Sequence, residues 1–160
     1  PFVVGDSLNL DTYTGKVEHI GIKTTRLRSE SGEQIILSNA DILKSRVRNY
    51  GRAQELRALA TIRVTYGTPS ETLQSIPKLL ERIVREQENA RFERCHLKTL
   101  GDSALHFELS YFAQAPSVNP LLDLQQAVNF RIIDEFRRLG VEFDYPTQRV
   151  IVAQQRVPAG

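Results

Sequence analysis

The apolar residues of the stretch 15–28 change parity along the chain, and this change constrains the fold more than any other feature. The positions concerned are Val17 and Leu27, which are odd, and Ile20 and Ile22, which are even. Side chains of an unbroken strand alternate between two faces, so the register must shift within this stretch. Gly21 is the expected site of a bend or bulge that shifts the register, because glycine tolerates such a kink. Strongly bent strands are typical of small barrels, and we expect a compact β-barrel.

Short strands and one helical turn are predicted around this stretch. The expected strands cover residues 7–11, 33–38 and 46–50. Between the last two, residues 39–43 are expected to form a helical turn, with Asn39 as its N-cap. The first domain is therefore predicted to span residues 1–52.

Residues 53–160 show a different order of elements, which predicts a second domain. Residues 56–66 alternate as a half-buried strand does. The sequence Thr68-Pro69-Ser70-Glu71 predicts a capping box with Thr68 as N-cap, and Pro77 predicts a kink with a restart near Ser75. Strands at 92–100 and 104–112, a helix from Asn119 that ends at Gly140, and a strand at 148–153 complete the order. This order is that of a ferredoxin-like (βαββαβ) domain, so the expected fold class is α+β.

Several segments, in this order, resemble the Sm-like middle domain of the small-conductance mechanosensitive channels (the MscS-like family). They are Pro1–Asp6, Gly15–Ile22, Thr25–Arg28, Ser38–Leu43 and Asn49–Tyr50. Residues 140–146 resemble the segment that closes the carboxyl domain of that family, although Asp144 stands where the family often has proline. The resemblance covers essentially the whole chain.

The resemblance implies a function and an assembly. It implies the cytoplasmic vestibule portion of an inner-membrane ion channel that opens under membrane tension and releases ions and small solutes in osmotic downshock. It also implies a homoheptamer, with no catalytic residue, cofactor, metal, nucleic acid or dedicated small-molecule substrate. The segment 149–155 would pair between subunits, with Val150, Ile151 and Val152 as the candidate strand; the alternative is that this strand completes the sheet of its own subunit.

The chain contains no methionine, and its formal net charge is +2. We therefore expect a piece of a longer protein, and by resemblance the absent part would hold transmembrane helices in contact with lipid. The longest aliphatic run is Ile35–Leu37, far below the roughly twenty residues of a spanning helix. A charge this small does not demand a polyanionic partner.

A basic crossing, residues 44–57, contains the candidate functional residues Arg46, Arg48 and Arg52. Glu55 is its only acidic residue. The crossing is either a solvated linker, a membrane-proximal or vestibule surface, or a nucleic-acid contact. Each basic residue near an anionic leaflet would gain about 1 kcal/mol.

Two other functions compete with the channel. An RNA-binding Sm-like protein would use the basic residues, but only Phe2, Tyr13 and Tyr50 supply aromatic rings in the barrel segment. A GDSL-type hydrolase would use Ser7 of Gly5-Asp6-Ser7-Leu8, but no Asp-x-x-His sequence is present to complete the site. Cys95 and His96 are adjacent, so a strand would point them to opposite faces, and we expect Cys95 to be a core residue.

Overall fold

The computed structural model describes residues 2–52, 55–114 and 118–144. Its first five strands form one antiparallel sheet in the order β4-β3-β2-β1-β5. They are β1 (Ser7–Leu10), β2 (Tyr13–Ile20), β3 (Thr24–Arg28), β4 (Gln34–Ser38) and β5 (Val47–Asn49). The helix α1 (Asn39–Lys44) and the 3-10 helix η1 (Tyr50–Arg52) flank β5 in the chain.

The predicted register shift is present, but its predicted position was wrong. The pairing of β2 with β3 shifts between Val17 and His19, so the extra residue of the bulge is Glu18. Gly21 lies in the turn that follows β2, where its N–H donates to the carbonyl of Thr24 at 2.8 Å. At this bulge the Glu18 carboxylate is paired with Arg28 of the neighbouring strand.

The first sheet encloses a small apolar core. Its buried members are Leu8, Leu10, Val17, Leu27 and Ile42, and Phe2, Ile35 and Leu37 pack against them. Ile20 and Ile22, whose even positions contributed to the parity argument, are surface residues, and Ile22 is 98% exposed. Part of the parity change therefore reflects two exposed residues and not a second buried face.

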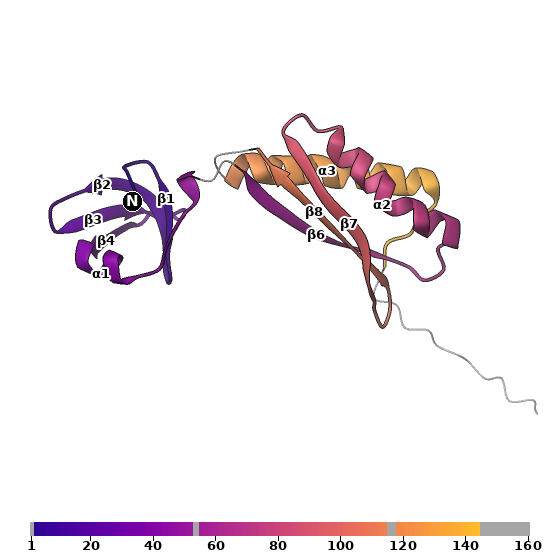
Figure 1. Cartoon of the computed structure of the whole chain (residues 1–160), viewed down its shortest axis with the longest axis horizontal. Helices are drawn as coiled ribbons and strands as arrows, with labels where there is room; N and C mark the ends of the chain where they lie inside the picture. The colour runs from indigo at the N-terminus through magenta and orange to yellow at the C-terminus, as the bar shows by residue number, and fades with distance from the viewer. Residues whose placement is uncertain (1, 53–54, 115–117, 145–160) are drawn as a thin grey trace, which may run out of the picture.

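The second half of the chain forms a three-stranded antiparallel sheet with two helices. Its elements are β6 (Leu56–Val64), α2 (Ser70–Arg85), β7 (Ala90–Leu100), β8 (Leu105–Ala113) and α3 (Val118–Leu139). The strand order is β6-β8-β7, and both helices lie on the same face of this sheet (Figure 1). The predicted mixed α+β class is confirmed in this coarse form. The predicted strand at 148–153 lies outside the described residues.

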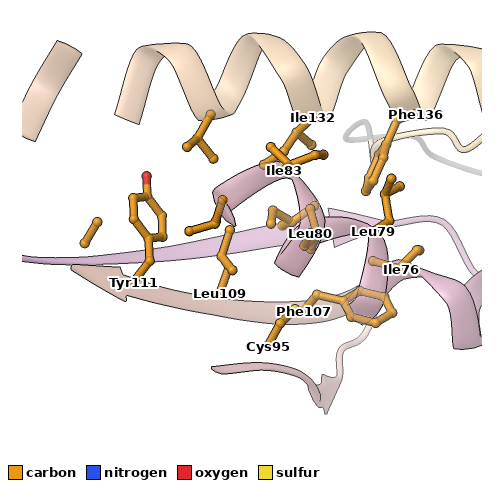
Figure 2. Packing of buried hydrophobic residues seen from close by; sticks show 14 of the residues in the cluster. Ile76, Leu79, Leu80, Ile83, Cys95, Phe107, Leu109, Tyr111, Ile132 and Phe136 are labelled. Carbon is orange, nitrogen blue, oxygen red and sulfur yellow. The ribbon is translucent and has the colours of Figure 1, made fainter. Parts of the chain in front are cut away.

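The core of this second half lies between the sheet and the helices (Figure 2). Ile76, Leu80 and Ile83, at helical spacing on α2, are completely buried. Phe107, Leu109 and Tyr111 of β8, together with Ile132 and Phe136 of α3, complete the layer. The alternation predicted for β6 and the helical periodicities of α2 and α3 therefore place the expected faces inward.

Two details of α2 differ from the prediction. Thr68 is not the N-cap, because the helix begins at Ser70 after Pro69, and the Thr68 hydroxyl donates to the Thr65 carbonyl at 2.9 Å. The helix also continues through Pro77 without a restart. Near the expected break, the Ser75 hydroxyl donates to the Thr72 carbonyl at 2.7 Å. At the end of α3, Gly140 has φ +68°, as expected for a residue that ends a helix.

Candidate functional site

Arg46 and Arg48 present two positive charges at the edge of the first sheet. Arg46 lies between α1 and β5, and Arg48 lies at the centre of β5 opposite Asn9 of β1. Both are exposed, and their spacing of two along an extended chain directs them to one side. Among the described residues, neither has an ion-pair partner. Arg52 ends η1, and its side chain lies outside what the structure describes.

The position of β5 is fixed by a junction at Asp6. The Asn49 amide donates to Asp6 Oδ2 at 2.7 Å, and the backbone N–H of Val3 donates to the same oxygen at 3.0 Å. The N–H of Gly51 donates to Asn49 Oδ1 at 3.0 Å. A Cβ atom at position 51 would lie 2.9 Å from the Asp6 Cα, so glycine is required for this close approach. The junction joins the start of β1 to the chain that leaves β5.

Asn39 holds the turn between β2 and β3 against α1. Its amide nitrogen donates to the carbonyls of Gly21 and Ile22 at 2.9 and 3.1 Å, and its Oδ1 accepts from the Thr25 hydroxyl at 2.8 Å. The predicted N-cap role of Asn39 was wrong, because Ser38 is the cap and its hydroxyl accepts from the N–H of Ala40. The sequence could not show this role, because the partners of Asn39 lie 14 to 18 residues away.

Arg28 differs from Arg46 and Arg48 because its charge is already neutralised. Its guanidinium donates to both carboxylate oxygens of Glu18, with N–O distances of 2.8 and 3.0 Å, and to the carbonyl of Gly32 at 2.9 Å. The hydrogen bond from Arg28 lowers the pKa of Glu18 below its ordinary value. The unpaired positive charge of the first sheet therefore includes Arg46 and Arg48, but not Arg28.

The helix-free face of the second sheet is also ion-paired. Glu108 accepts from Lys98 at 2.8 Å and pairs with Arg94 at 2.6 Å, and hydrogen bonds from these two cations lower its pKa. Arg57, a member of the basic crossing, lies 3.4 Å from Glu93. The positive charge predicted along the crossing is therefore partly cancelled once the chain folds.

A second group of charges joins α2 to α3, and sequence reasoning missed it. Glu135 is only 9% exposed and accepts from Arg82 of α2 at 3.2 Å and from Arg138 at 2.8 Å. Arg131 lies 3.4 Å from Glu135 and 3.0 Å from Glu86. The hydrogen bond from Arg138 is the main cause that lowers the pKa of Glu135. The spacing of Glu135 to Arg131 and Arg138 is visible in the sequence, but the contact with Arg82 is not.

The candidate residues for catalysis are separated in the structure. Ser7 lies in β1 opposite Lys16, whereas His96 and His106 belong to the second sheet. Cys95 is buried in the core, and burial raises the pKa of its thiol to about 12, while His96 is exposed. Within the described ranges, no group of three or more side chains suited to a metal ion occurs. Of the helices in those ranges, none combines the length and apolar character needed to cross a bilayer.

Two family models match the chain, one after the other. Residues 1–52 match the "Mechanosensitive ion channel, beta-domain", and residues 58–143 match "Mechanosensitive ion channel MscS, C-terminal". The chain belongs to the MscS family of mechanosensitive channels. The two matched segments correspond to the two sheets, and the boundary between them falls in the basic crossing.

Curated relatives and solved structures agree with this assignment. The "Small-conductance mechanosensitive channel MscMJ" of Methanocaldococcus jannaschii is 31% identical over 94% of this chain and 43% of the relative. The "Large-conductance mechanosensitive channel MscMJLR" of the same organism is 28% identical over 92% of this chain and 42% of the relative. The chain therefore spans less than half the length of these relatives.

Two solved structures share the fold at low sequence identity. The structure of Helicobacter pylori MscS in its closed state has a TM-score of 0.80 and 20% identity, and covers 97% of this chain and 60% of that one. Arabidopsis thaliana MSL1 has a TM-score of 0.80 and 18% identity, over 91% of this chain and 53% of that one. At these identities the likeness establishes the fold alone.

Proposed function

We propose that this MscS-family chain is the cytoplasmic vestibule portion of a mechanosensitive ion channel. The channel opens under membrane tension and releases ions and small solutes in osmotic downshock. The observation that carries this proposal is the match of both halves of the chain, in order, to two consecutive domains of the channel family. The chain itself has no catalytic role in this proposal.

The finer architecture belongs to the same proposal. The five antiparallel strands of residues 1–52 form an Sm-like barrel, for which the bulge at Glu18 and the order β4-β3-β2-β1-β5 give support. Residues 53–160 form a ferredoxin-like domain in this proposal. The spatial order β6-β8-β7, with both helices on one face, is the order that the first three strands of a ferredoxin-like sheet take, and it supports this fold.

The chain assembles, in this proposal, as a homoheptamer on the cytoplasmic side of the inner membrane. Lipid contacts come from transmembrane helices that precede these two domains in the full-length protein. A head-to-tail contact that closes on itself produces a ring. The segment containing Val150, Ile151 and Val152 pairs between neighbouring subunits, which its β-branched composition favours.

Arg46, Arg48 and Arg52 supply positive potential to the vestibule or to its membrane-proximal rim. The exposure of Arg46 and Arg48, and their lack of an ion-pair partner among the described residues, support this role. A ring multiplies these charges by the number of subunits, and a surface of one sign raises the local concentration of the opposite ion.

Patch recordings from membranes that carry the full-length protein test this proposal. We expect tension-activated currents, and we expect Arg46→Gln with Arg48→Gln to shift the reversal potential toward cation preference at an unchanged opening tension. Arg46→Lys with Arg48→Lys is the matched control, because it changes the same two side chains and keeps both positive charges. Absence of tension-activated current would refute the channel function. Equal reversal potentials in all variants would refute only the electrostatic role.

A further inference from the structure

The chain enters and leaves the first sheet at the same end of one strand pair. β1 begins at Ser7 and β5 ends at Asn49, and the two strands are antiparallel, with Leu8 opposite Asn49. In an antiparallel pair the start of one strand lies beside the end of the other, so the segments before β1 and after β5 are neighbours. The pairing of β1 with β5 is short, with three residue pairs.

The junction at Asp6 closes this end of the strand pair. Asp6 is 8% exposed, and its Oδ2 accepts from the N–H of Val3, ahead of β1, and from the side-chain amide of Asn49, the last residue of β5. Asn49 Oδ1 accepts in turn from the N–H of Gly51. Two side chains therefore connect the segment that enters the sheet to the segment that leaves it.

The backbone on the far side of Asp6 is held by β2. The N–H of Gly5 donates to the Val17 carbonyl at 2.8 Å, and the N–H of Val17 donates to the Asp6 carbonyl at 2.8 Å. A Cβ atom at position 51 would lie 3.0 Å from Asp6 Oδ1, in addition to its close approach to the Asp6 Cα. Asp6 is therefore fixed from β2, and the segment after β5 is fitted against it.

We infer that Asn49 is a positioning residue for channel opening, because it couples the two segments through Asp6. This inference rests on the proposed function, in which the transmembrane helices precede the first sheet and the second half of the chain follows it. A displacement of those helices during opening reaches the second half through the junction, and the second half resists it. The resistance is limited by the bonds of the junction, and one net hydrogen bond corresponds to about twofold to tenfold in open probability.

Patch recordings of the full-length protein at graded membrane tension test this role. Asn49→Ala removes the bonds to Asp6 and Gly51, and Gly51→Ala separates the same segments but keeps the Asn49 side chain. Both should open at lower tension, with an open probability about twofold to tenfold higher well below the half-opening tension. The shift of the double variant should be smaller than the sum of the two, because both changes open one junction.

Two matched controls separate this role from a general loss of stability. Thr25→Val removes one hydrogen bond inside the same sheet, and Gly67→Ala adds a methyl group where a Cβ atom would meet nothing within 4 Å. Both should leave the opening tension unchanged. The maximal current at saturating tension verifies that each variant folds and assembles. Asn49→Gln, which displaces the same amide by one carbon, replaces Asn49→Ala if that variant gives no maximal current.

The outcomes distinguish the inference from the function on which it rests. An unchanged opening tension in the variants of Asn49 and Gly51, at full maximal current, would overturn the inference and leave the channel function intact. An equal shift in Thr25→Val would also overturn it, because loosening of the sheet would then explain the effect. Absence of tension-activated current from the unsubstituted protein would refute the proposed function itself.

Discussion

Replacing Asn39 by alanine should destabilise the first sheet more than any exposed polar substitution in it. The change removes two donors to the carbonyls of Gly21 and Ile22 and one acceptor for the Thr25 hydroxyl. Each such bond contributes about 0.5–1.5 kcal/mol net, and a buried hydroxyl without a partner costs about 1–3 kcal/mol. Thr25 is completely buried. Because two of the bonds are only part-buried and one is exposed, we expect a total loss of about 2–3 kcal/mol.

Urea denaturation of the two sheets, with hydrogen exchange of the segment 13–28 as the local readout, measures this loss. Thr25→Val removes only one of the three bonds and should cost about 1 kcal/mol. The double variant should show a coupling of about 1 kcal/mol between the two positions. Asn9→Ala is the control, since it removes a single exposed bond to Thr14 and should change stability by less than about 0.5 kcal/mol. An Asn39→Ala loss no larger than that of Asn9→Ala would refute the reasoning.

Two further predictions concern ionisable groups in the second half of the chain. The pKa of Glu135 is lowered in the folded chain, so its contribution to stability is present above the ordinary carboxyl pKa of 4.5 and is lost as the pH falls through the folded value. In Glu135→Gln, the unfolding temperature should therefore fall less between neutral and acidic pH than it does in the unsubstituted chain. An equal fall in both chains would contradict the assignment. The Cys95 thiol, with its pKa raised to about 12 by burial, should react with a thiol reagent at pH 8 only after urea unfolds the sheet. Rapid labelling of the folded chain would show that the thiol is accessible.

The periodic parts of the fold could be predicted from the sequence because one physical rule fixes each of them. Alternation over 56–66 identified the buried face of β6, and three- and four-residue spacing identified Ile76, Leu80 and Ile83 as the inner face of α2. These patterns report on burial, which dominates the free energy of folding. Gly140 was predictable for a similar reason, because a positive φ selects glycine.

Features decided by hydrogen bonds were harder to predict. The parity change located the bulge only to the segment between Val17 and Leu27, and it did not show that the extra residue is Glu18, whose carboxylate binds Arg28 of the neighbouring strand. Thr68 has the residue type of a cap, but its hydroxyl donates instead to the Thr65 carbonyl. Local sequence names the donors and acceptors, but the fold decides which of them meet.

The same limit applied to the candidate site. Arg46 and Arg48 were identified from the sequence as part of a basic crossing, and the structure leaves both exposed. Sequence could not show that Arg28 and Arg57 are neutralised, because Glu18 and Glu93 reach them through strand pairing and not through neighbouring positions.

The junction of Asp6 with Asn49 determines how mechanical force would travel through the first sheet. The two residues are 43 positions apart in the chain, yet one hydrogen bond joins them. A pull applied between the start of β1 and Gly51 would therefore load this bond together with the backbone pairing of β1 with β5, and β2, β3 and β4 would carry little of it. The first sheet would then resist extension until the Asp6–Asn49 bond and the pairing of β1 with β5 break together.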